Sequence, residues 1–172
     1  MEAAEMCIRL RPCRPGDFHA VAAFIHRLYL KYVTPGCSTR AGVRWWSAFL
    51  SPGEENRAAI EKRYRADTIA LLAVRRGRLA GVVMGNKREL VRLFVDDRLH
   101  RRGIGRRLFA AFEARCRRLG SRRFRVVASL YAVPFYLSCG CRRTTGVRDY
   151  HGVRVQPLRK TLAAPLRGGP KA

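Results

Sequence analysis

The chain has 172 residues and a mass of 19.6 kDa, which is room for a single domain with one core. Apolar residues make up 48% of it and charged residues 28%, which excludes wholesale disorder, and no uncharged apolar run reaches the roughly 20 residues of a membrane span. Lysine and arginine number 36 against 12 aspartates and glutamates. The formal net charge of +24 favours an anionic partner, such as nucleic acid, a phosphorylated cofactor, an acidic protein or a membrane surface.

The excess of positive charge has a second explanation. Most of the basic residues are arginines scattered along the chain, a composition that GC-rich codon usage also produces. Glu2 and Glu5 lie in an N-terminus without an apolar core, so we expect no secretory signal and a cytoplasmic protein. The six cysteines form no paired C-x-x-C clusters, and we therefore expect reduced thiols and no metal site.

The first half of the chain predicts two helical regions and four strands. Apolar residues from Phe18 to Tyr32 recur at the three- and four-residue steps of an amphipathic helix. A second helical region is expected over about 43–64, interrupted at Ser51-Pro52-Gly53. The expected strands are an alternating segment at 8–11 and apolar runs at 68–74, 79–85 and 89–95.

The second half predicts two more helices and three more strands. Ile104 to Leu119 carries one apolar helical face and is followed by Gly120, and Pro134 suits the start of a short helix. The expected strands lie at 124–128, 142–145 and 153–158, the last two joined by a turn near 150–152. We therefore predict one α/β (α+β) domain over 1–162, built on a mixed sheet, and an unstructured tail over 163–172.

The segment from Glu89 to Gly105 carries the clearest chemical signal. An apolar strand runs into a turn, and two glycines, Gly103 and Gly105, open a basic helix. Glycines let backbone N–H groups approach a ligand closely, and a helix start adds unpaired donors and the positive end of the helix dipole. With the neighbouring arginines, this arrangement predicts a diphosphate site.

At this point the sequence resembles the GNAT acetyltransferases. The family signature Gln/Arg-x-x-Gly-x-Gly/Ala corresponds to His100–Gly105, and a second element, F-Y-x-x-x-G-F, corresponds to Phe135–Cys141. The resemblance covers about residues 8 to 162. The chain departs from the family pattern at His100, at Cys141 and at Ser129, where an Asn often contacts the cofactor.

The resemblance implies the GNAT fold, with a mixed, mostly antiparallel sheet of six to seven strands flanked by about four helices. It also implies transfer of the acetyl group of acetyl-CoA, as co-substrate, to a primary amine by direct attack. The residues expected to hold acetyl-CoA are Leu93, Phe94, Val95, Arg101, Arg102, Gly103, Ile104, Gly105, Arg106 and Ser129.

Two residues match catalytic positions of the family. Tyr136 corresponds to a tyrosine that protonates the departing thiolate, although the same sequence is also compatible with a tyrosine that only packs in the core. Glu89 corresponds to a glutamate that deprotonates the amine through water, although a solvated strand-end glutamate is the simpler interpretation. Of the adjacent Trp45 and Trp46, in a region that lines the acceptor side in the family, we expect one in the core and one at a pocket.

Two other functions remain open: a non-catalytic, basic nucleic-acid-binding protein, and an acyl-CoA-binding regulator on a GNAT scaffold. The acceptor amine and the oligomeric state also stay open. The net charge ranks an acceptor on an acidic partner, or one carrying a carboxylate or phosphate, above a polycation. The few carboxylates in or near predicted strands that could form an acidic pocket are Asp67, Glu89, Asp96, Asp97 and Asp149.

Overall fold

The computed structural model describes residues 8–163, so all but the first residue of the tail predicted over 163–172 lies outside the described residues. Within this range the helices are α1 (Phe18–Tyr32), α2 (Arg40–Leu50), α3 (Arg57–Arg65), α4 (Ile104–Arg118) and α5 (Val133–Ser138). The strands are β1 (Arg9–Pro12), β2 (Ile69–Arg75), β3 (Arg78–Asn86), β4 (Glu89–Val95), β5 (Arg123–Ser129), β6 (Arg142–Arg143), β7 (Arg148–Tyr150) and β8 (Val153–Thr161).

The strands form one mixed sheet in the order β1-β2-β3-β4-β5-β8-β6, with β7 also paired to β8. Only the contact between β4 and β5 is parallel, and the other strand pairs are antiparallel. The predicted α/β class and the mostly antiparallel sheet are therefore confirmed. The described residues contain one more strand than predicted, β7, and the helical region expected over 43–64 consists of two helices, α2 and α3.

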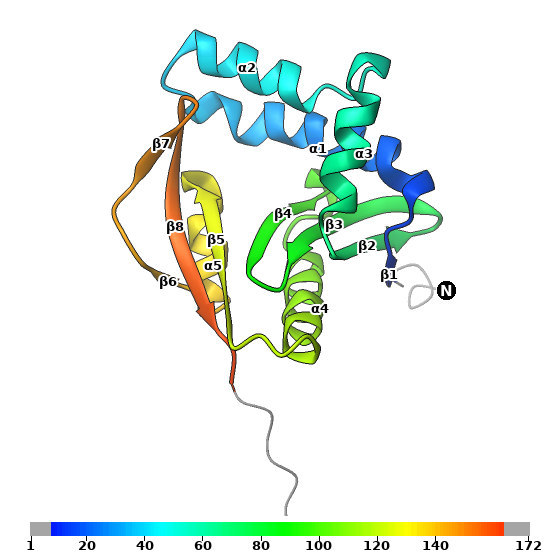
Figure 1. Ribbon diagram of the computed structural model, residues 1–172, viewed down its shortest axis with the longest axis vertical. Coiled ribbons are helices and arrows are strands. Elements are labelled where there is room, and N and C mark those ends of the chain that lie inside the picture. Colours follow the sequence, from blue (N-terminus) through cyan, green and yellow to red (C-terminus); the bar gives the residue numbers. More distant parts are fainter. Residues whose placement is uncertain (1–7, 164–172) are drawn as a thin grey trace, which may run out of the picture.

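Helices cover both faces of the sheet (Figure 1). On one face, α4 buries Leu108 and Phe112 against β3 and β5, in a cluster that also includes Val126 and Leu158. On the other face, α1 and α3 pack on β2 and β3 through a second cluster that includes Ile25. The three- and four-residue spacing of the apolar positions gives α1 and α4 the single apolar face that this packing requires.

A third, smaller cluster joins α2 to the hairpin of β7 and β8. Trp46 is buried there against Val153 and Val155, and its ring lies 5.0 Å from that of Tyr29 in α1. Trp45 stays 38% exposed and stacks on His151 with ring centroids 4.0 Å apart. Trp46 is therefore the tryptophan expected in the core. Trp45, the one expected at a pocket, does not line the cleft that is described in the next subsection.

Candidate active site

A β-bulge in β4 sets the position of the cleft. Met84 of β3 lies opposite Arg92 and Gly85 lies opposite Leu90, so Val91 is an extra residue without a partner. A bulge bends its strand and increases the local twist. The parallel pairing of β4 with β5 ends at the same point, after Leu90 and its partner Val126. Beyond it the two strands diverge, and the space between them is a cleft of about 700 Å³.

The cleft is lined by five parts of the chain that are far apart in sequence. They are the end of α1, the second half of β4, the loop that leads into α4, the end of β5, and α5. The lining residues predicted from the sequence are Leu93, Phe94, Val95, Arg101, Gly103, Ile104, Gly105, Arg106, Ser129 and Tyr136. Two other predicted site residues, Arg102 and Glu89, do not line it.

The loop into α4 presents a row of free backbone amides. Among the described residues, none of the N–H groups from Arg101 to Arg106 donates a hydrogen bond, and the first to do so is that of Arg107, to the carbonyl of Gly103 at 3.0 Å. Arg101 and Gly103 both have positive φ angles, of 59° and 75°. Successive free amides at a helix start bind anions well, so this loop fits a diphosphate group.

The two glycines of this loop have different roles. A side chain on Gly103 would meet no atom within 4 Å, so the space next to it is open. A Cβ on Gly105 would lie 3.1 Å from the ring of Phe135 in α5. The space next to Gly103 is therefore open, whereas the space next to Gly105 is taken up by the close packing of α4 on α5.

The second half of β4 offers backbone groups to the cleft. The N–H of Asp96 donates to the carbonyl of Ala80 in β3 at 2.9 Å, and residues along a strand alternate in the direction of their backbone groups. The backbone groups of Val95, and those of Leu93 two residues earlier, therefore face away from β3. The ring Nε2 of His100 lies 3.1 Å from the carbonyl of Val95. An extended ligand with amide groups could pair along this edge.

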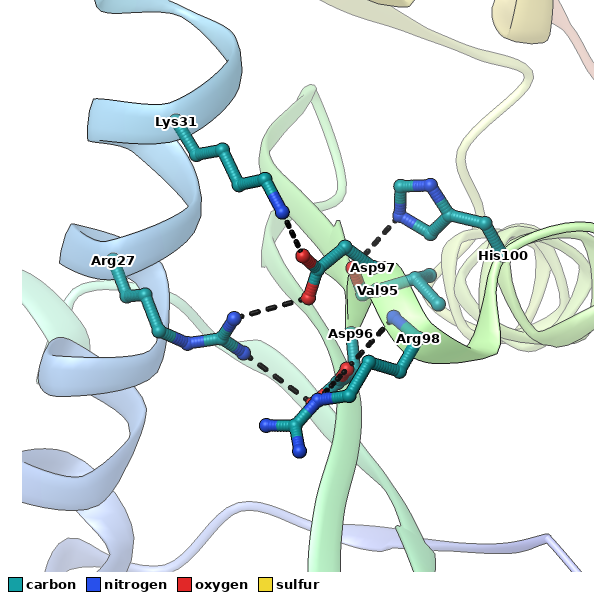
Figure 2. A network of polar contacts seen from close by, with 7 residues as sticks. All are labelled: Arg27, Lys31, Val95, Asp96, Asp97, Arg98 and His100. Atoms are coloured by element: carbon teal, nitrogen blue, oxygen red, sulfur yellow. Dashed lines mark hydrogen bonds and ion pairs between the residues drawn. The ribbon is translucent and has the colours of Figure 1, made fainter.

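An ion-pair network ties α1 to the turn between β4 and α4 (Figure 2). Arg27 pairs with Asp96 at 3.3 Å and with Asp97 at 3.0 Å, and Lys31 also pairs with Asp97. The hydrogen bonds from Lys31 and Arg27 lower the pKa of Asp97 below its ordinary value. The network therefore holds the end of α1 next to the loop with the free amides at neutral pH.

Tyr136 is the only tyrosine of α5, and it lies between the cleft and the core. It is 5% exposed, and its ring packs 6.0 Å from Phe109 and 5.2 Å from Phe135. Burial, and to a lesser extent the neighbouring Cys141, raise the pKa of Tyr136 above its ordinary value. The neutral phenol is therefore the stable form of Tyr136 at neutral pH.

Glu89 lies at the closed end of the cleft, where β4 and β5 still pair. Its carboxylate accepts a hydrogen bond from Arg125 of β5 at 2.8 Å, and its side chain is 24% exposed. Val91, the nearest cleft-lining residue along β4, is two residues away, or about 7 Å along a strand. The proposed role of Glu89 as a base remains a prediction, which would require water to relay the proton.

Several cleft residues were not predicted from the sequence. Tyr32 at the end of α1 stacks on Tyr131, which follows β5, with ring centroids 5.1 Å apart, and it also lies 5.7 Å from the ring of His100. These three aromatic rings come from three sides of the cleft. The apolar spacing in α1 indicates a core-facing helix, and nothing in it shows that the last turn reaches the cleft.

The chain is similar to one family model and to several solved structures. A family model described as an acetyltransferase (GNAT) domain matches residues 36–162. Among solved structures, a GCN5-related N-acetyltransferase from Rhodopseudomonas palustris is 20% identical with a TM-score of 0.76, covering 92% of this chain and 98% of its own. The PaiA N-acetyltransferase from Thermoplasma acidophilum, solved with coenzyme A, is 19% identical with a TM-score of 0.67, covering 91% and 100%.

A third structure, the putative acetyltransferase YncA from Salmonella typhimurium with acetyl-CoA, is 15% identical with a TM-score of 0.65, covering 94% of this chain and 99% of its own. No curated protein sequence matches this chain significantly. Within residues 8–163, no helix has the length and apolar character needed to cross a membrane, and no three His, Cys, Asp or Glu side chains gather as a metal site.

Proposed function

Because the chain belongs to the GNAT acetyltransferase family, we propose that it transfers the acetyl group of acetyl-CoA to a primary amine by direct attack. One observation carries the proposal: five of the six residues with free amides from 101 to 106, all but Arg102, line one end of a cleft that Tyr136 also lines. An anion-binding loop and a buried proton donor in one cleft fit a phosphorylated thioester co-substrate.

Acetyl-CoA supplies the activated acetyl group, and the residues of this chain would bind and orient it. The amides of the loop would hold the diphosphate, with Arg101 and Arg106 adding positive charge where they line the cleft. The backbone of Leu93 and Val95 would pair with the amide groups of the pantetheine arm. Ser129, at the end of β5, would contact the arm from the opposite wall.

The reaction needs three proton or charge adjustments. The amine nitrogen forms a bond to the thioester carbon as the carbon–sulfur bond breaks, and the amine loses one proton. The proposed base is Glu89, acting through water, and a backbone N–H near Val95 would stabilise the negative charge that develops on the thioester oxygen. The departing thiolate would take its proton from Tyr136, whose phenol is neutral at neutral pH.

The experiment that tests this function combines binding and turnover. Calorimetry measures acetyl-CoA binding to the full chain, and release of free CoA is measured over a panel of small amines and of peptides with free α- or ε-amines. We expect acetyl-CoA to bind and at least one amine to be acetylated. Binding without turnover on any amine would favour the acyl-CoA-binding regulator. Binding of nucleic acid without binding of acetyl-CoA would favour the non-catalytic nucleic-acid-binding protein.

A further inference from the structure

A group of arginines lies on one open face of the sheet, and we call it the arginine face: Arg123 and Arg125 of β5, Arg142 of β6 and Arg159 of β8. Arg125 lies directly opposite Arg159, and Arg159 lies directly opposite Arg142. Paired residues of neighbouring strands point to the same face of a sheet, so these three arginines form a row across three strands. Arg123 lies two residues from Arg125 on β5 and therefore shares that face.

This face is opposite to the one that α4 covers. Phe124 and Val126, which alternate with the arginines along β5, are buried in the cluster beneath α4. All four arginines are exposed, and the strands that carry them lie together at one side of the molecule (Figure 1). Like charges directly opposite each other in a sheet destabilise it, so a row of three arginines carries a cost in stability.

The arginine face has one negative partner among the described residues. Arg125 pairs with Glu89, and within residues 8–163 neither Arg123, Arg142 nor Arg159 forms an ion pair or a side-chain hydrogen bond. A surface with this charge and exposure is complementary to an anionic partner.

The arginine face leads directly into the cleft. The next position along β5 on the same face is Val127, which is 45% exposed and lines the cleft. Arg125 therefore lies about 7 Å along the strand from the cleft wall, and Arg123 about 7 Å farther. An extended molecule whose amine enters the cleft beside Val127 would pass over the arginine face.

The carboxylates that could have attracted a cationic acceptor are all engaged. Asp67 pairs with Arg92, Glu89 pairs with Arg125, and Asp96 and Asp97 pair with basic residues of α1. Asp149 accepts hydrogen bonds from the hydroxyl of Ser38 at 3.2 Å and from the N–H of Gly152 at 2.9 Å. The described residues thus provide no free acidic pocket next to the cleft.

We propose that the arginine face binds an acidic segment of a polypeptide acceptor and holds it so that its amine reaches the cleft. This inference rests on the proposed function and names the class of its acceptor. Along β5 the arginines recur at the two-residue spacing of an extended strand, the same repeat at which side chains of an extended peptide face one side. Acidic residues that begin two to three positions from the amine would lie over Arg125 and the rest of the row.

A polypeptide fits this face better than a single-stranded nucleic acid. Proteins that bind single strands combine a basic groove with aromatic side chains on which bases stack. No aromatic residue lies in the two rows of this face, which are Arg125, Arg159 and Arg142, and next to them Arg123 and Thr161. The exposed aromatic residues lie in α2, in β7 and after β5 instead.

The test compares two peptides and two matched double variants of the full chain. The acidic peptide carries one free amine followed, from the third residue, by four Asp or Glu, and the neutral peptide has Asn or Gln at those four positions. Each is made with a free α-amine, or with a single lysine and a blocked N-terminus. The variant is Arg142→Glu/Arg159→Glu, and the control is Arg115→Glu/Arg118→Glu, which makes the same change in charge on exposed positions of α4.

Binding is measured by fluorescence anisotropy of C-terminally labelled peptides, in parallel with CoA release. We expect the wild type to bind the acidic peptide at least about tenfold more tightly than the neutral one, since exposed ion pairs are individually weak and add over the row. The Arg142→Glu/Arg159→Glu variant should lose this preference in both Kd and KM, with kcat on the neutral peptide and acetyl-CoA affinity retained. The control variant should keep the preference.

Equal binding of the two peptides, or an equal loss in the control variant, would overturn the inference. So would single-stranded RNA that binds more tightly than the acidic peptide and depends on Arg142 and Arg159. Failure of the proposed function gives a different result, because no peptide would then be acetylated, whether or not acetyl-CoA binds. The anisotropy measurements would still decide whether the arginine face binds the acidic peptide.

Discussion

Gly105 at the start of α4 lies so close to Phe135 of α5 that a Cβ on the glycine would be 3.1 Å from the aromatic ring. Phe135 precedes Tyr136, whereas Gly105 belongs to the loop with the free amides. This contact connects the proposed diphosphate site directly to the proposed proton donor. The spacing between α4 and α5 thus sets the distance between the proposed diphosphate site and Tyr136.

Gly105→Ala should destabilise the protein by about 1 kcal/mol, because the added methyl group requires the ring of Phe135 to move by a few tenths of an ångström within a closely packed contact. Urea unfolding measures the loss. Phe135→Leu removes ring atoms from the contact, so the double variant Gly105→Ala/Phe135→Leu should lose less stability than the sum of the two single variants. Strictly additive losses would show that the two residues do not interact.

Gly103→Ala should lower both the stability of the protein and its affinity for acetyl-CoA, and a matched control variant separates the two effects. Its φ of 75° is unfavourable for alanine, so we expect a loss of about 1 kcal/mol in stability, and the methyl group would enter the open space of the cleft and weaken acetyl-CoA binding at least tenfold. Gly120→Ala is the matched control: its φ is 73°, a Cβ there meets no atom within 4 Å, and it lies after the far end of α4. Calorimetry measures the Kd for acetyl-CoA. If both variants have the Kd of the wild type, the loop at Gly103 does not bind acetyl-CoA.

Asp97→Asn should reduce stability at neutral pH and lose this effect in acid. The pKa of Asp97 is lowered in the folded protein by Lys31 and Arg27, so the ionised carboxylate stabilises the fold above its ordinary pKa of about 4. This contribution disappears as the pH falls through the lowered folded-state value. Urea unfolding of the wild type and the variant, at neutral pH and at several values below pH 4, measures the difference, which should shrink steadily. A difference that stays constant with pH would mean that the ion pairs contribute nothing.

The buried thiols should be unreactive while the protein is folded. Burial raises the pKa of Cys116 to about 11 and that of Cys141 to about 12, so little thiolate forms at pH 8. Mass spectrometry after treatment with iodoacetamide should find both residues unmodified in the native protein and modified in urea. Rapid modification of Cys141 in the native protein would contradict its burial in the core.

Strands and helices bounded by clear signals were predicted well from the sequence. The run from Glu89 to Val95 forms β4 with the expected bounds, and the apolar stripe that starts at Ile104 forms α4 up to Arg118. The strand β7 was missed, because its residues Arg148–Tyr150 are all exposed and show no alternation. It forms by pairing with β8, a partner that the local sequence does not reveal.

The parts of the site that depend on register could not be predicted. The bulge at Val91 exists only in relation to β3, and the pair of Glu89 with Arg125 joins residues 36 positions apart. The row of Arg125, Arg159 and Arg142 likewise appears only when three strands are aligned, whereas in the sequence these residues are three of many scattered arginines. The motif around Gly103 could be recognised because its amides and its helix start are contiguous in the chain.

The measurement that tests the account most directly is kcat of Tyr136→Phe with the amine that the wild type acetylates best. The variant keeps the ring and its packing against Phe109 and Phe135, so stability and the Kd for acetyl-CoA should hardly change. Loss of a positioned general acid should lower kcat by about 10²–10⁴-fold. A kcat equal to that of the wild type would contradict the proposed mechanism and leave Tyr136 as a core aromatic.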